Sequence, residues 1–359
     1  MDRKLLYSTV ALIAIGMVMI YSSSSVMAES RFGSHFFFLK KQLIYLVMAG
    51  LIGWGITRID LKKYAPYAIP ALFLSLVMLA MVFIMPARNG SHRWLFLGPL
   101  TVQPSEIFKL VAIVYLAFSL SQKSRDITDL KQFLLPYAPL LGAGLILIIL
   151  EPGLGSAITI TLTVLIIFFL AGVRLFHLAV LILPLTAFVS FMVFILGYKK
   201  ARVIDYMSAV TDPLNGSYQV KQAVLALGAG GIFGSGLGDG KQKLFFLPYP
   251  HTDFIFASIG EELGFIGLVG ILILFYIVIR RGIQIALNQP DKFGFLLAIG
   301  ITASLFIAVL INIGVVTSLL PTTGIPLPFL SYGGSALMVS VVSVAILLNL
   351  SRRKGIVVR

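Results

Sequence analysis

Ten long apolar segments constrain this chain more than any other feature of its sequence. A helix needs about 20 mostly apolar residues to cross the hydrocarbon core of a bilayer. The segments lie at residues 5–23, 42–57, 65–85, 105–121, 133–150, 156–172, 175–196, 254–279, 293–314 and 331–350. We therefore expect residues 1–359 to form one polytopic membrane domain, all-α, with about ten transmembrane helices.

The composition supports a membrane protein. Hydrophobic residues make up 58% of the chain and charged residues 12%, whereas a soluble domain has about 45–50% apolar and about 25% charged residues. A soluble core could not bury this much apolar surface, so lipid must surround most of it. The first apolar segment is long and lacks a small-residue cleavage site, so we expect it to be retained as a helix.

The distribution of basic residues predicts the orientation. A net charge of +14 would suggest nucleic-acid binding in a soluble protein. Here Lys and Arg lie mostly in short loops, where they set topology and meet anionic headgroups, so no nucleic-acid partner is expected. With the N-terminus in the cytoplasm, the cytoplasmic segments carry 16 Lys and Arg and the short outer loops carry 5. Both termini are therefore predicted to be cytoplasmic.

One predicted connection, residues 197–253, is much longer than the others and lies on the predicted outer side. A loop of this length in a compact protein is usually functional or disordered. Apolar runs at 220–227 and 244–247 indicate that it is folded, partly re-entrant and resting on the outer face. Its glycines between residues 228 and 240 predict a tightly packed loop, or a bare backbone that approaches a headgroup. No strand–helix unit surrounds them, so a nucleotide site is not expected.

Ionisable residues at membrane depth are costly and are treated as functional hypotheses. Glu106 and Lys109 are three residues apart, hence on one helix face, and can pair. The pair either locks helix packing or belongs to a site. Asp253 begins the eighth predicted helix, where a carboxylate either stabilises the helix dipole or acts in catalysis.

Further polar residues lie near these three. Glu151 follows the fifth predicted helix, and Glu261 and Glu262 lie two to three turns inside the eighth. The pair at 261–262 is expected either to form structural hydrogen bonds or to serve the site. His251 is a hydrogen-bonding neighbour of Asp253 or a catalytic partner. The chain contains no cysteine, which excludes disulfides and thiolate chemistry.

The predicted outer face thus gathers groups of three kinds. It holds carboxylates (Glu106, Glu151, Asp253), cations (Arg93, Lys109, Lys241, Lys243) and aromatic rings (Trp94, Tyr218, Phe245, Tyr249). Such a set is suited to an anionic amphiphile. The residues alone leave open whether the protein is a transporter or an enzyme.

Four stretches resemble the SEDS family (shape, elongation, division and sporulation), and together they span nearly the whole chain. They are Leu319-Leu-Pro-Thr-Thr-Gly-Ile-Pro-Leu-Pro-Phe-Leu-Ser-Tyr-Gly-Gly-Ser335, His251-Thr-Asp-Phe-Ile-Phe-Ala-Ser-Ile-Gly-Glu-Glu-Leu-Gly264, Arg93-Trp-Leu-Phe-Leu-Gly-Pro99 and Gln103-Pro-Ser-Glu-Ile-Phe-Lys109. Lys241-Gln-Lys-Leu-Phe-Phe-Leu-Pro248 is more similar to division and sporulation members than to elongation members.

The resemblance implies a peptidoglycan glycosyltransferase that polymerises lipid II into β-1,4-linked glycan strands at the outer face of the bacterial cytoplasmic membrane. A role at the division septum is expected, with an elongation-type polymerase, a lipid II flippase or a non-catalytic scaffold as alternatives. Asp253 is expected to be the general base. The expected substrate-binding residues are Arg93, Trp94, Gln103, Lys109, Gln219, Lys241, Lys243, His251, Ser331 and Tyr332, supported by Glu106, Glu151, Glu261 and Glu262.

The resemblance also implies partners: a class B penicillin-binding protein that crosslinks the strands, and the FtsQ–FtsL–FtsB complex. The sequence requires no cofactor and identifies no metal ligands, although Mg²⁺ or Mn²⁺ could meet the diphosphate charge. Three positions depart from the family pattern: Gly153 stands where an Asp is usual, Tyr249 where a Glu is common, and Thr101 where many relatives carry a basic residue.

Overall fold

The protein is described by a computed structural model at residues 1–86, 92–98, 100–122, 129–212, 216–241, 244 and 246–352. Within this part, nine helical segments are long and apolar enough to cross a membrane, and a tenth apolar helix has 17 residues. The ten are α1 (Arg3–Phe32), α2 (Phe37–Ile56), Leu61–Ile84, α5 (Pro104–Ser121), α6 (Leu130–Leu150), α7 (Leu154–Ala171), α8 (Leu175–Phe194), α11 (Ile255–Leu287), α12 (Lys292–Val316) and α13 (Gly334–Leu350). The third comprises α3 (Leu61–Tyr64), η1 (Ala65–Tyr67), α4 (Ala68–Met81) and η2 (Val82–Ile84). They match the ten predicted segments in order, which confirms the all-α membrane fold.

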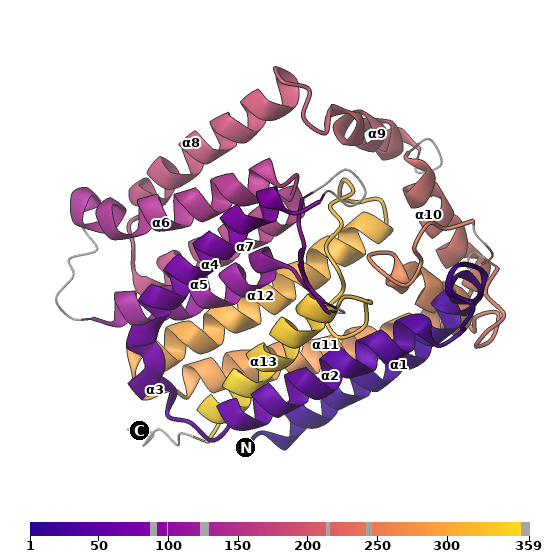
Figure 1. The fold of residues 1–359 in the computed structure, drawn as a ribbon, viewed down its shortest axis with the longest axis horizontal. Helices are drawn as coiled ribbons and strands as arrows, with labels where there is room; N and C mark the ends of the chain where they lie inside the picture. The colour runs from indigo at the N-terminus through magenta and orange to yellow at the C-terminus, as the bar shows by residue number, and fades with distance from the viewer. Residues whose placement is uncertain are drawn as a thin grey trace.

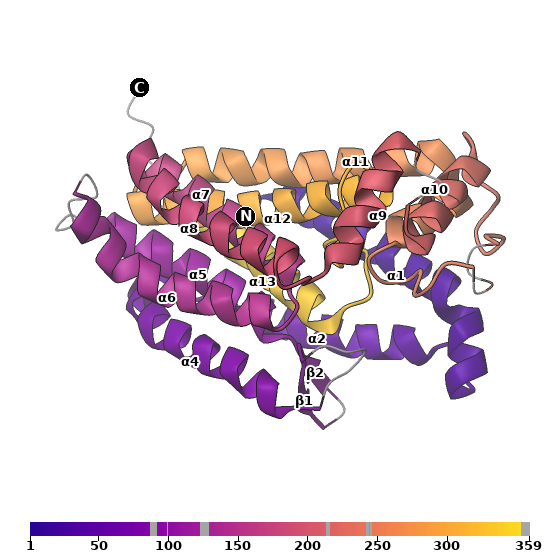
Figure 2. The same cartoon turned by 90° about the horizontal axis from the view of Figure 1, so that it is seen from above.

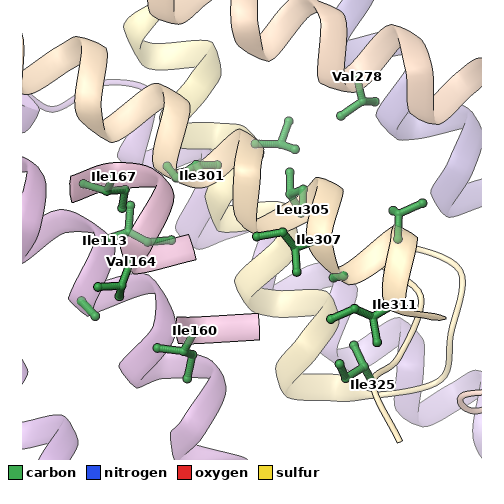
Figure 3. Close-up of a cluster of buried hydrophobic side chains, with 14 of the residues drawn as sticks. Ile113, Ile160, Val164, Ile167, Val278, Ile301, Leu305, Ile307, Ile311 and Ile325 are labelled. Carbon is green, nitrogen blue, oxygen red and sulfur yellow. The ribbon is translucent and has the colours of Figure 1, made fainter. Parts of the chain in front are cut away.

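The most buried helix, α12, lies in the middle of the bundle (Figures 1 and 2). It packs against α5, α7, α11 and α13, while α13 also packs on α2 and α1 packs on α11. Branched side chains such as Ile113, Val164 and Ile301 fill the space between α5, α7 and α12 (Figure 3). The outermost helix, α8, is mostly exposed and borders only the α6 and α7 side of the bundle (Figure 1).

The first helix, α1, is longer than its apolar segment predicted. At about 1.5 Å per residue, the 30 residues of α1 exceed the hydrocarbon thickness of about 30 Å, so its final turns extend beyond the bilayer core. Gly33 then ends α1 in the left-handed conformation, with φ 65°. Hydropathy identifies only the part of a helix that crosses the lipid, so the apolar segment ends before the helix ends.

The described residues between 197 and 253 include two helices, in agreement with the prediction that this segment is not disordered. They contain α9 (Lys200–Thr211) and α10 (Tyr218–Gly230), and α10 packs against α11. Their position outside the cell stays a prediction. A short antiparallel hairpin that the sequence did not predict, β1 (Leu95–Leu97) and β2 (Leu100–Val102), precedes α5. Its ladder satisfies backbone polar groups in the loop.

The glycine-rich segment packs against a break in α11. Gly264 interrupts the helix with φ 66° and ψ −169°, a conformation that glycine alone adopts readily. The backbone N–H of Phe265 donates to Gly231 (2.9 Å), and the N–H of Ser235 donates to the carbonyl of Glu261 (2.9 Å). A Cβ on Gly234 would lie 2.3 Å from the carbonyl oxygen of Glu262. The predicted tight packing of this loop is confirmed.

Candidate active site

A narrow polar pocket lies where α5, α7 and the segment 319–333, here called the signature loop, come together. The starts of α5 and α7 lie at the opposite end of the bundle from the start of α1 and the end of α13 (Figure 1). The polar lining of the pocket includes Arg93, Gln103, Glu106, Lys109, Ser156 and Thr323. Three of the predicted substrate-binding residues therefore meet here, at Arg93, Gln103 and Lys109.

The first two turns of α5 place an ion pair in this pocket. Lys109 Nζ lies 2.6 Å from Glu106 Oε2, and the two side chains are only 14% and 9% exposed. Both residues also line a second cavity between α5, α12, α13 and the signature loop. The predicted pairing is confirmed, and the pair borders two cavities instead of sitting inside packed apolar side chains.

The N-terminus of α7 also faces the pocket. Gly153 precedes the helix without a side-chain cap, and Gly155 and Ser156 line the pocket wall. A Cβ on Gly155 would lie 2.8 Å from the carbonyl oxygen of Thr323, so only glycine lets α7 approach the signature loop this closely. A helix N-terminus carries partial positive charge and attracts anions. Sequence analysis missed this element, although the spacing of its glycines was the available signal.

Asp253 lies beside Gly324, one of the residues that line the pocket. It is half-buried in the turn immediately before α11, and its Oδ1 accepts a hydrogen bond from the Thr252 hydroxyl (2.6 Å). Its Oδ2 lies beside Gly324, where an added Cβ would be 3.9 Å away. Gly324 lines the pocket, and the Asp253 charge acts on the Arg93 guanidinium, so the carboxylate lies next to the pocket lining without belonging to it.

Backbone carbonyls hold Arg93 in place. Its Nε donates to the carbonyl of Glu151 (3.1 Å), and its guanidinium also donates to the carbonyl of Pro152. The Glu151 side chain is 1% exposed, and its Oε1 has no hydrogen-bond partner within the described residues. Burial raises the pKa of Glu151 to about 8, with the Arg93 charge opposing that shift. Glu151 therefore supports Arg93 through its backbone while its side chain is neutral.

A further cation, Arg202 of α9, was missed by the sequence analysis. Its Nη1 donates to the carbonyl of Thr322 (2.8 Å), which joins α9 to the signature loop. Burial lowers the pKa of Arg93, and the charge of Arg202 lowers it further, so these guanidinium groups are near neighbours. The available signal was the cluster of basic residues Lys199, Lys200 and Arg202 at the start of the long loop.

His251 and Tyr332 do not line the pocket. Their rings pack against each other and against Phe38, with 4.3 Å between the His251 and Phe38 ring centroids. The backbone N–H of Tyr332 donates to the carbonyl of His251 (2.8 Å). Burial is the main reason that the pKa of His251 falls to about 4, so the imidazole is neutral at physiological pH.

Four other predicted substrate-binding residues also lie away from the pocket lining. Ser331 accepts a hydrogen bond from the Leu327 backbone (2.8 Å) and closes a turn. Trp94 is half-buried before β1, Gln219 lies in the first turn of α10, and the Lys241 side chain is exposed. Lys243 lies outside the described residues.

Glu261 and Glu262 fasten the glycine-rich segment to the bundle. Glu261 Oε1 accepts from the Lys241 backbone (2.7 Å), and Glu262 Oε2 accepts from the Gly238 backbone (3.0 Å) and the Ser22 hydroxyl (2.6 Å). These are the structural hydrogen bonds that one of the two sequence interpretations expected. Within the described residues, no three His, Cys, Asp or Glu side chains form a group that could hold a metal ion.

Comparison with known proteins gives concordant matches over the whole chain. The model of the cell cycle protein family FtsW/RodA/SpoVE matches residues 3–355. A probable peptidoglycan glycosyltransferase FtsW from Geobacter metallireducens is 41% identical, with 98% of this chain and 95% of that protein covered. Stage V sporulation protein E from Bacillus subtilis is 40% identical, with 98% and 97% covered. A chain from a peptidoglycan synthase complex that coordinates polymerization and crosslinking superposes with a TM-score of 0.79 and 28% identity, with 98% and 97% covered.

Proposed function

The chain belongs to the FtsW/RodA/SpoVE family, the SEDS family that its motifs predicted, and on this basis we propose that it is a peptidoglycan glycosyltransferase that polymerises lipid II. The observation that carries the assignment of the site is the position of the Asp253 carboxylate beside Gly324, which lines a pocket that also contains Arg93 and Lys109. A polymerase of lipid-linked sugars needs both features, a base and a site for the leaving diphosphate.

Asp253 is the proposed general base. The acceptor is the 4-hydroxyl of the GlcNAc on one lipid II, and a sugar hydroxyl is a poor nucleophile at neutral pH. As Asp253 takes the hydroxyl proton, the oxygen attacks the anomeric carbon of MurNAc on the second lipid II. A C–O bond forms on one face while the bond to undecaprenyl diphosphate breaks on the other. The product is a β-1,4 linkage with inverted configuration.

The cations of the pocket are proposed to stabilise the leaving diphosphate. Arg93, Lys109 and the N-terminus of α7 converge on the pocket, and Arg202 adds charge beside Arg93. Such donors act most strongly where water is partly excluded and charge develops during the reaction. Glu106 holds Lys109 in position and offsets one of the positive charges.

The central test is Asp253→Asn. The purified variant should incorporate lipid II into glycan polymer at least about 10²-fold more slowly than the native protein, the lower limit expected for loss of a general base. Product is measured on gels with labelled lipid II. Because Asp and Asn are nearly isosteric, an unchanged Tm will show that the fold persists. Full polymerase activity of the variant would rule out Asp253 as the base.

A divalent cation is proposed to enter with the substrate rather than to occupy a protein site beforehand. A diphosphate itself binds Mg²⁺ or Mn²⁺, which then shares the charge with Lys109 and Arg93. We expect a chelator to lower polymerisation and either ion to restore it. Calorimetry of the protein without lipid II should detect no stoichiometric Mg²⁺ binding, and a tight site there would contradict this assignment.

The cellular setting follows from the same proposal. Lipid II exposes its headgroup outside the cytoplasmic membrane, so the pocket should face outward with both termini in the cytoplasm. The sequence lacks the S-D-N and K-T-G elements that accompany the serine of penicillin-binding proteins, so a class B penicillin-binding protein is the proposed partner for crosslinking. The similarity to FtsW favours the division septum, with FtsQ–FtsL–FtsB as the proposed activator.

A further inference from the structure

Asn312 joins the turn that carries Asp253 to the wall of the pocket. It lies on the strongly apolar helix α12 and is 1% exposed. Its side-chain nitrogen donates to the backbone carbonyl of Asp253 (2.7 Å) and to that of Ile325 (2.8 Å). One amide group thus fixes two segments that lie 72 residues apart in the sequence.

We propose that Asn312 is the positioning residue of the polymerase, setting the Asp253 carboxylate against the signature loop. This inference rests on the proposed function. Ile325 directly follows Gly324, the residue that Asp253 Oδ2 faces. The two hydrogens of the Asn312 amide therefore fix the backbone of the base and the backbone of the surface opposite it.

The energetics favour positioning over stability as the role of this residue. A polar side chain that hydrogen-bonds between membrane helices contributes only about 0.6–2 kcal/mol. Asn312 Oδ1 has no hydrogen-bond partner within the described residues, and an unsatisfied buried acceptor costs about 1–3 kcal/mol. The two contributions nearly cancel. An apolar residue would serve packing at this position as well, but it could not hold the two carbonyl groups.

The turn before α11 is the part of the site that most needs such support. Residues 251–254 are turns rather than helix, so the helical ladder does not fix Asp253. A displacement of about 1 Å at a catalytic group can lower a rate about 10²-fold. Arg93 and Lys109 are held by other contacts, to Glu151 and Glu106. Loss of the Asn312 amide should therefore impair the chemical step while substrate binding persists.

The chain offers a matched control at the other end of the bundle. Asn349 of α13 is 7% exposed, and its amide donates to the carbonyls of Ile56 (2.7 Å) and Ile59 (2.8 Å). It makes the same pair of hydrogen bonds as Asn312, with the same distances, far from Asp253. Substitution of Asn349 reports what losing such a pair costs the fold alone.

The experiment compares Asn312→Leu with Asn349→Leu in the full-length protein with purified lipid II. We expect Asn312→Leu to lower kcat about 10²-fold, with KM for lipid II within about twofold because the cationic pocket is intact. Asn349→Leu should change Tm by about as much as Asn312→Leu does, and it should leave kcat within about threefold of the native value. Asn312→Ser, which keeps one donor, serves as the second variant should the Leu variant not fold, and should lose at least about tenfold in kcat.

Three results would overturn the inference. The first is a native kcat in folded Asn312 variants. The second is a rise in KM that accounts for the whole loss of kcat/KM. The third is a loss of kcat in Asn349→Leu as large as in Asn312→Leu when the two variants have the same Tm. Asp253→Asn is measured in parallel to separate this inference from the proposed function. An inactive Asp253→Asn with a fully active Asn312→Leu overturns the positioning role alone, whereas a fully active Asp253→Asn overturns the base.

Discussion

The side chains of this pocket are positioned by hydrogen-bond and ion-pair partners, and sequence motifs predict only some of these partners. Lys109 and Glu106 were predicted from their spacing, because residues three apart share a helix face, and they form the ion pair. Asp253 was predicted from its motif, and its carboxylate lies beside Gly324 of the pocket lining. His251 shares that motif, yet its ring turns into an aromatic cluster with Phe38. The one-dimensional motif does not specify the direction of each side chain.

The Glu106–Lys109 pair should matter for stability and activity in separable ways. Removing one partner of a buried pair leaves an uncompensated charge and costs about 3–5 kcal/mol. We expect Glu106→Ala to lower Tm markedly, and Glu106→Ala combined with Lys109→Ala to recover most of that loss, while neither protein polymerises lipid II. Thermal unfolding in detergent measures the first effect and gel assays measure the second.

The exposed pair Lys62–Asp291 is the control for this series. Its atoms are 3.3 Å apart, but the Lys62 side chain is 63% exposed, and surface pairs contribute about 0–1 kcal/mol. Lys62→Ala should therefore change Tm little. The explanation fails if the double variant at 106 and 109 is less stable than Glu106→Ala alone.

Glu151 should make stability depend on pH in an unusual direction for a carboxyl group. Its folded pKa of about 8 exceeds the ordinary value of 4.5, so the folded protein retains a proton that the unfolded chain releases between these values. The stabilisation is fully present below pH 4.5 and is lost as pH rises through 8, at up to about 1.4 kcal/mol per pH unit. Glu151→Gln should remove this contribution. The readout is the difference in Tm between the native and variant proteins from pH 5 to 9; a constant difference would contradict the raised pKa.

At the scale of elements, hydropathy located the membrane helices because lipid requires apolar residues around a hydrogen-bonded backbone. It could not locate the break in α11, since the whole segment is apolar enough to be predicted as one helix and a single glycine such as Gly264 does not by itself indicate a break. The break exists because the segment 231–236 supplies replacement backbone partners. A local sequence pattern cannot report hydrogen bonds between segments about 30 residues apart. The β1–β2 hairpin escaped prediction because its strands have only three residues each.

Gly264→Ala tests whether this break is required. At φ 66° and ψ −169°, a side chain is strained, and its Cβ would lie 2.3 Å from the backbone nitrogen of Gly234. We expect a loss of at least about 1–3 kcal/mol, seen as a lower Tm. Gly270→Ala in the same helix is the matched control, because no atom lies within 4 Å of its added Cβ. Equal Tm values for the two variants would show that α11 tolerates a continuous helical form.

At the scale of the whole molecule, the pocket exists only when distant segments assemble. Four segments meet at one end of the bundle (Figure 1). They are the start of α5, the start of α7, the turn before α11 and the signature loop. The number of helices and the distribution of basic residues predict which helix ends lie on the same side of the membrane, and to that extent the sequence could predict that these segments meet. It could not predict that α9 brings Arg202 to the signature loop, because that contact depends on how the long loop folds back.

The orientation of the bundle in the membrane can be tested because the chain contains no cysteine. Tyr64 is 49% exposed, and it lies at the end of the bundle where Lys62 pairs with Asp291 and Arg352 donates to Thr57. Phe246 is 52% exposed in the long loop near Asp253. The excess of basic residues at the first end predicts that it faces the cytoplasm.

Single cysteines at Tyr64→Cys and Phe246→Cys should therefore react differently with a membrane-impermeant maleimide. In intact spheroplasts we expect labelling at 246 and protection at 64, and after lysis both should react. The cysteine-free parent controls for background labelling, and retained polymerase activity shows that each variant is folded. Labelling at residue 64 in intact spheroplasts would mean that this end of the bundle faces outward and that the Asp253 pocket faces the cytoplasm. A polymerase of the external cell wall could not act there.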